Sequence, residues 1–121
     1  MSPEPDDHLA QQLRALRREY LADSTQRVEE LRRLFGRVSA GERAALPDLQ
    51  QAFHRLAGSG GSYGFPAVSA RSRDGERLAS ALSGAGSPIQ PADLESLRDC
   101  VEGVAGAFAE ALTAIDAESR G

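Results

Sequence analysis

The chain has 121 residues, of which 40% are hydrophobic and 26% charged, and its formal net charge is −4. This length suits one globular domain, and the composition is not that of a disordered chain. An acidic balance argues against nucleic acid as the main partner, because phosphate binding needs a basic face. No apolar run is long enough to span a membrane and MSPEPDDH is not a secretory signal, so we expect a cytoplasmic protein.

Cysteine and histidine are too scarce for a disulfide or a metal site. Cys100 is the single cysteine, and His8 and His54 are the only histidines. These three residues lie far apart in sequence and show no metal-ligand spacing. We therefore expect no metal and no cofactor of the protein's own.

The first predicted helix covers residues 6–36, after a disordered segment 1–5. No stretch of the chain alternates apolar and polar residues as a strand would. Gly36 and Gly41 suggest where this helix ends, and a polar gap at residues 23–26 interrupts its apolar face. Its apolar positions are Leu9, Leu13, Leu16, Tyr20, Val28, Leu31, Leu34 and Phe35.

Three further helices are predicted. The second begins near Pro47, which suits a first helical turn, and its end is left open because GSGGSYGF (58–65) has the composition of a loop. The third covers residues 66–82, and the fourth covers 91–118 after the break SGAGSP (83–88).

Four amphipathic segments with short connections predict an all-α fold. The expected architecture is an antiparallel four-helix bundle in up-down-up-down order over residues 6–118, with 119–121 disordered. The inner face of the third helix is thin, since Ser72 and Gly75 stand where a core residue is expected. That helix is either loosely packed or unusually close to its neighbour.

His54 lies outside the apolar face of the second helix. At about 100° per residue, it falls roughly 140° from Leu49, which together with Phe53 and Leu56 defines the core direction. Gly58 and Gly61 follow on the side of His54, so few side chains would cover its ring. An accessible neutral imidazole is a nucleophile that can form covalent intermediates. The residues alone leave open two simpler interpretations, a solvated histidine and a helix that ends at Gly58.

The segment HRLAGSGGSYG (54–64), with Val68 and Glu76 downstream, resembles the histidine-containing phosphotransfer (HPt) domain of two-component signalling. The resemblance extends over residues 6–118, essentially the whole chain. The positions that match the family pattern are His54, Leu56, Gly58, Ser59, Gly64, Val68 and Glu76.

The resemblance implies that His54 is a phosphoacceptor. It would take a phosphoryl group from an aspartyl phosphate of a receiver domain, or from another phosphohistidine, and pass it on. Such a protein is a phosphocarrier without its own kinase or ATP site, and Mg²⁺ is expected on the receiver. The implied partners are a response-regulator receiver domain and a hybrid histidine kinase, and we expect a monomer.

Glu76 is the residue that the resemblance pairs with His54. It would accept a hydrogen bond from the Nδ1–H group of the ring, which leaves Nε2 as the nucleophile. The simpler alternative is a solvated glutamate.

The chain departs from the family pattern at Ala57, where the family has a lysine. We hypothesise that Arg73, on the same side of its helix as Glu76, supplies the missing positive charge; the alternative is a solvated arginine. The expected partner-binding residues are Gln50, Ala57, Gly58, Gly61 and Arg77. Because of this departure, a pseudo-phosphotransfer domain that binds a receiver without being phosphorylated remains an alternative function. An oligomerising bundle without a signalling role is a more distant one.

Overall fold

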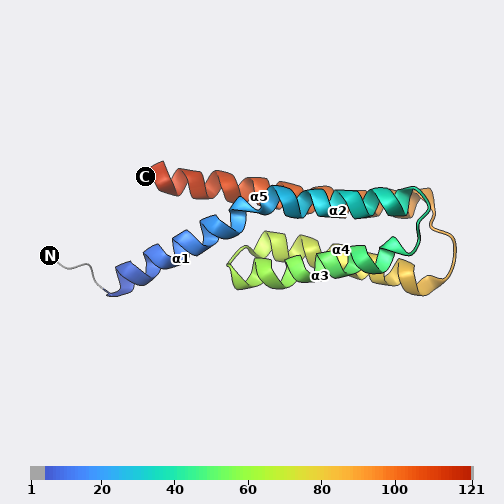
Figure 1. The fold of residues 1–121 in the computed structure, drawn as a ribbon, viewed down its shortest axis with the longest axis horizontal. Helices are drawn as coiled ribbons and strands as arrows, with labels where there is room; N and C mark the ends of the chain where they lie inside the picture. Colours follow the sequence, from blue (N-terminus) through green and yellow to red (C-terminus); the bar gives the residue numbers. More distant parts are fainter. Residues whose placement is uncertain (1–4, 121) are drawn as a thin grey trace.

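Five α-helices make up residues 5–120, the part of the chain that the computed structural model describes (Figure 1). The helices are α1 (Pro5–Ala22), α2 (Ser24–Ser39), α3 (Ala45–Ser62), α4 (Pro66–Ala85) and α5 (Pro91–Arg120). No strand occurs in this range, so the predicted all-α class is confirmed. Of the segments predicted as disordered, residues 1–4 and 121 lie outside the described residues, whereas the prediction is wrong for Pro5, which begins α1, and for residues 119–120, which belong to α5.

Helices α2 to α5 form the four-helix bundle. Each runs opposite to the one before it, and α2 and α5 lie side by side along one edge of the bundle (Figure 1). Arg43, in the α2–α3 connection, donates hydrogen bonds to the carbonyl oxygens of Leu82 and Ser87, which ties this connection to the end of α4 and the chain that follows it. The largest fully buried apolar side chains are Leu21, Leu31, Leu46, Leu49, Phe53, Val68, Leu97, Val101, Val104 and Phe108.

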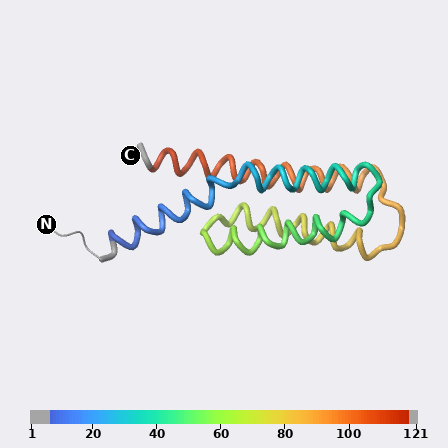
Figure 2. Tube along the Cα trace, viewed as in Figure 1, coloured from blue at the N-terminus to red at the C-terminus, as the bar shows by residue number. Residues whose placement is uncertain are grey.

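The predicted helix over residues 6–36 is wrong in one respect, because the chain bends at Asp23 and separates α1 from α2. The bend falls within the polar gap at 23–26, where no apolar side chain holds the helix against the core. Helix α1 leaves the bundle at an angle (Figure 2). Of its side chains that the structure describes, only Tyr20 and Leu21 in the last turn are buried. Leu9, Leu13 and Leu16 of the predicted apolar face are all exposed, so this part of the face is not buried in the bundle.

The glycine-rich segment 58–65 is mostly helical, because α3 continues to Ser62. The chain turns into α4 at Gly64, whose φ of +83° is a conformation that favours glycine. Helix α3 keeps Gly60 despite its low helix propensity because α4 lies directly against it. A Cβ atom at Gly60 would lie 3.0 Å from Cγ1 of Val68. The interpretation that the helix ends at Gly58 is therefore excluded.

Helices α3 and α4 also approach closely at Gly75. A Cβ atom there would lie 2.5 Å from two ring carbons of Phe53, a fully buried side chain. The ring of Phe53 fills the space that a larger residue at Gly75 would need. Of the two possibilities left open by the thin face of this helix, close approach is the one observed.

Candidate functional site

His54 lies on the solvent side of α3. Its side chain is 64% exposed, whereas Phe53 beside it is fully buried. The apolar stripe of α3 faces the core and sets the direction of every other residue on the helix. The exposed position of His54 therefore follows from its place outside that stripe.

Glu76 of α4 contacts the ring of His54. Its Oε1 lies 2.7 Å from Nδ1 of His54, and its side chain is 27% exposed. A carboxylate can only accept a hydrogen bond, so Nδ1 is the donor, and in the neutral form of the ring the lone pair then lies on Nε2. The two residues that the sequence paired are brought together by the close approach of α3 and α4.

A shallow groove of about 540 Å³ surrounds this pair. Arg73 and Arg77 of α4 line it, so the structure places both predicted arginines beside His54. Arg77 lies 3.6 Å from a carboxylate oxygen of Asp74, and Arg73 forms no ion pair with any side chain in the described part of the chain. The full lining is Gln50, His54, Arg73, Glu76, Arg77, Ser80 and Ala81.

The surface that follows His54 on α3 is formed by small residues. Gly58 is exposed, with open space where a Cβ atom would be, and Gly61 is exposed beside Ser69. Ala57 does not belong to this surface, because it is only 5% exposed. The prediction of Ala57 as a partner contact is therefore not supported, and its methyl group is a packing residue.

Comparison with protein families shows which family the chain belongs to. A family model described as "Hpt domain" matches residues 15–107, well over half of the chain. The chain belongs to the Hpt domain family. Membership assigns it to the phosphorelays of two-component signalling. Searches of curated proteins and of solved structures gave no match.

Two hydrogen bonds that support the Hpt site have no signal in the sequence. The buried hydroxyl of Ser69 donates to the carbonyl oxygen of Ala57 at 2.7 Å, which links α4 to the turn of α3 after His54. The hydroxyl oxygens of Tyr20 and Ser59 lie 2.7 Å apart, which links the last turn of α1 to α3. Serine and tyrosine are too common for such pairs to be recognised without the fold.

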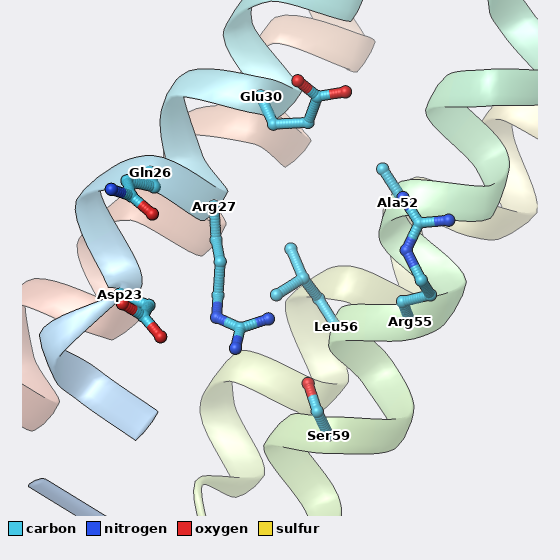
Figure 3. A pocket seen from close by; sticks show the side chains of 8 residues that line it. All are labelled: Asp23, Gln26, Arg27, Glu30, Ala52, Arg55, Leu56 and Ser59. Atoms are coloured by element: carbon cyan, nitrogen blue, oxygen red, sulfur yellow. The ribbon is translucent and has the colours of Figure 1, made fainter. Parts of the chain in front are cut away.

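A second cleft of this Hpt domain lies between α2 and α3, on the other side of α3 (Figure 3). Arg55 lines this cleft, so it points away from the groove of His54 although it is the next residue. Arg27 reaches from α2 toward Leu56 and Ser59, with its guanidinium 4.8 Å from the ring centre of Tyr20. The cleft holds as many acidic as basic side chains and is not part of the histidine site.

The remaining titratable candidates lie outside the groove. His8 is exposed on α1, where its Nε2 is 3.3 Å from Nε2 of Gln12. Cys100 is half-buried on α5, and burial raises the pKa of its thiol. Residues 5–120 contain no cluster of three or more side chains suited to bind a metal ion, and no helix there combines the length and apolarity of a membrane span.

Proposed function

We propose that this Hpt domain accepts a phosphoryl group on Nε2 of His54 from the aspartyl phosphate of a receiver domain, or from a phosphohistidine, and relays it. One observation carries the proposal. An exposed imidazole is held through Nδ1 by Glu76 at 2.7 Å, which leaves Nε2 accessible beside a surface of small residues. Membership in the family alone does not require that this particular ring is reactive.

The transfer balances without a base on the Hpt domain. The Nε2 lone pair of His54 forms the new bond to phosphorus, the bond between phosphorus and the aspartyl oxygen breaks, and the aspartate leaves as a carboxylate. The ring then carries a positive charge, with its proton still on Nδ1. The carboxylate of Glu76 accepts from that N–H group and stabilises the charged ring.

The positive charge that the transferred phosphoryl group needs would come from two sources. The receiver is expected to bring Mg²⁺, which neutralises most of the charge in such reactions. Arg73 is the residue of the Hpt domain that we assign to the rest, because it lines the groove of His54 and forms no ion pair with the described side chains. It replaces the lysine that the family has at Ala57.

The proposal is tested by incubating the protein with a receiver domain that carries a radioactive phosphoryl group. We expect label on the Hpt domain that is stable in alkali and lost in acid, as for a phosphohistidine. His54→Gln removes all of it. Glu76→Gln keeps the size of the side chain and removes its charge, so it should slow transfer without preventing receiver binding.

Arg73→Ala tests the assignment of the positive charge, with Arg71→Ala as its matched control. Arg71 lies on the same helix but contacts α5 near Gly103 instead of lining the groove. We expect Arg73→Ala to slow transfer by roughly three- to tenfold, because an exposed charge contributes about 1 kcal/mol. Equal rates for the two variants would show that Arg73 has no role.

Ala57 favours a second candidate function, in which the domain binds a receiver without accepting phosphate. The family lysine is absent there, and the buried methyl group cannot replace its charge. A receiver that binds the wild-type protein but leaves no label, under conditions in which the receiver itself is phosphorylated, would support this function and contradict the first.

A further inference from the structure

The end of α3 that follows His54 is a weak piece of helix. It has the sequence GSGGS (58–62), in which three of five residues are glycines. Glycine lowers the stability of a helix because it loses the most backbone freedom on folding. Gly58 and Gly61 form the exposed surface of small residues beside His54. The helical conformation of this surface therefore depends on contacts from other parts of the fold.

The cap of α3 lacks an apolar contact that commonly accompanies its type. The backbone N–H of Phe65 donates to the carbonyl oxygen of Gly60 at 2.7 Å, and that of Gly64 donates to Gly61 at 3.2 Å. These are the two hydrogen bonds of a Schellman motif, in which the residue in the place of Phe65 often packs on a side chain in the last turns of the helix. Here those positions hold Gly60, which has no side chain, and Ser59, which has a polar one.

Tyr20, in the last turn of α1, supplies the missing contact. Its ring stacks on the rings of Phe65 and Tyr63, with the ring centres 5.8 and 4.5 Å apart. Tyr63 also closes α3, because its backbone N–H donates to the carbonyl oxygen of Ser59 at 3.0 Å. The hydroxyl oxygens of Tyr20 and Ser59 lie 2.7 Å apart. One side chain of α1 thus contacts both the end of α3 and the rings of two residues that cap it.

Tyr20 supports α3 from the side away from His54. Its contact on α3 is Ser59, which lines the cleft between α2 and α3 and not the groove of His54. Tyr20 is itself held in place, since it is only 4% exposed and lies between the ring of Phe108 and the guanidinium group of Arg27. A phosphoryl group on His54 would not touch it.

We propose that Tyr20 is a positioning residue, which keeps the end of α3 helical and so maintains the surface of small residues on which a receiver docks beside His54. This role rests on the proposed function, which gives that surface its partner. When the support is lost, residues 58–62 leave the helix for part of the time. The apparent affinity for a receiver then falls with the fraction of molecules that keep the surface.

Hydrogen exchange of backbone amides tests the support without any partner. Tyr20→Phe removes the hydroxyl that meets Ser59, and we expect the protection factors of the Tyr63 and Phe65 amides to fall about fivefold. Tyr63→Phe is the matched control, because it removes the same group from the neighbouring ring, where the hydroxyl has no hydrogen-bond partner among the described residues. Equal protection in the two variants would overturn the proposal.

Leu97→Val separates a local effect from a general loss of stability. Leu97 is fully buried on α5, about three turns before Phe108, and the substitution leaves a cavity there. We expect a lower midpoint of urea unfolding but unchanged protection of the Tyr63 and Phe65 amides. If their protection fell as far as in Tyr20→Phe, these amides would report global unfolding alone, and the local role of Tyr20 would be refuted.

Receiver affinity tests the consequence for docking. The probe is a receiver domain loaded with Mg²⁺ and beryllofluoride, which mimics its aspartyl phosphate and cannot be transferred. Tyr20→Leu removes the ring and the hydroxyl but keeps an apolar side chain. We expect its Kd for the receiver to be about three- to tenfold higher than that of Leu97→Val, with a smaller rise for Tyr20→Phe. An unchanged Kd in both Tyr20 variants would contradict the docking role.

Single-turnover transfer from a labelled receiver shows where Tyr20 acts. At saturating receiver, Tyr20→Phe should transfer at the wild-type rate, because the contact between His54 and Glu76 lies outside the supported segment. A slower rate at saturation would place the effect on the ring of His54 and refute a role in docking. A wild-type protein that takes no label, while the Tyr20 variants still weaken receiver binding, would refute phosphotransfer and support the role of Tyr20.

Discussion

The α3–α4 pair has small residues where its two helices touch, whereas helix α1 has large apolar residues that face solvent. Where α3 and α4 meet, the contact is made by Gly60 and Gly75. On α1, by contrast, three leucines face solvent. The small residues allow two helices to approach closely enough for His54 to reach Glu76, whereas the leucines of α1 lie beyond the bundle that could cover them.

The difference shows that an apolar stripe on a helix does not by itself lead to close packing against another helix of the same chain. The α3–α4 pair is held together by shape, since the ring of Phe53 fills the space at Gly75. Helix α1 also has an apolar stripe, but its leucines at positions 9, 13 and 16 are exposed, and of its described side chains only Tyr20 and Leu21 in the last turn are buried. Burial therefore depends on where a helix is placed, and not only on its pattern.

The largest change in stability is expected when one leucine is replaced in each region. Leu56→Ala should lower the free energy of unfolding by about 2–5 kcal/mol, because Leu56 is buried on α3 and a cavity would remain. Leu13→Ala should change it by less than about 0.5 kcal/mol, since Leu13 is already exposed. Urea unfolding at low protein concentration measures both, and equal losses would mean that α1 packs on the bundle.

The next test adds one methyl group to each of two glycines. Gly75→Ala should lower the free energy of unfolding by about 1–3 kcal/mol, because the new Cβ atom would collide with the ring of Phe53. Gly58→Ala is the matched control and should raise it by up to about 1 kcal/mol, since its Cβ atom meets open space in a helix. A stabilising Gly75→Ala substitution would show that the helices are not in close contact there.

A smaller effect is expected from the polar link between α3 and α4. Ser69→Ala removes the buried hydrogen bond to the carbonyl oxygen of Ala57 and should cost about 1 kcal/mol relative to Ser80→Ala. Ser80 lies on the same helix but is exposed, so it reports the helix propensity of the substitution alone. Thermal unfolding compares the two, and equal midpoints would remove Ser69 from the contacts that hold the pair.

The smallest change in the free energy of unfolding is expected at an ion pair that lies outside both regions. It serves as a reference for the larger effects above. Hydrogen bonds from Arg32 on α2 lower the pKa of Glu102 on α5. Because the pKa is lower in the folded state, the contribution is present at neutral pH and is lost as pH falls through the range where Glu102 becomes protonated. Both side chains are half-exposed, so Arg32→Ala should cost at most about 1 kcal/mol at neutral pH. The cost should vanish in acid; one that persists there would not come from the pair.

The bundle and the histidine site follow from the sequence to a large extent. The periodicity of α3 fixes its buried face and therefore places His54 outside it. Since α3 and α4 are joined by a tight turn at Gly64, the spacing from His54 to Glu76 decides which turns of the two helices lie side by side. Local pattern and short connection together predict that contact.

Other features depend on contacts that the pattern does not encode. A leucine stripe has the same spacing whether the chain itself or another molecule covers it, so the exposure of α1 required the structure. The helical conformation of 58–62 could not be predicted from glycine propensity, because packing against Val68 compensates the low propensity at Gly60.

The bond between His54 and Glu76 also bears on how quickly a partner can react. Each residue belongs to a different helix, and the two helices are locked together by Gly60, Gly75 and Phe53. The imidazole therefore loses its rotational freedom when the domain folds, and not when the partner arrives. In the proposed transfer, an encounter with a receiver would need no search for the correct ring orientation, because the ring is already oriented before the phosphoryl group arrives.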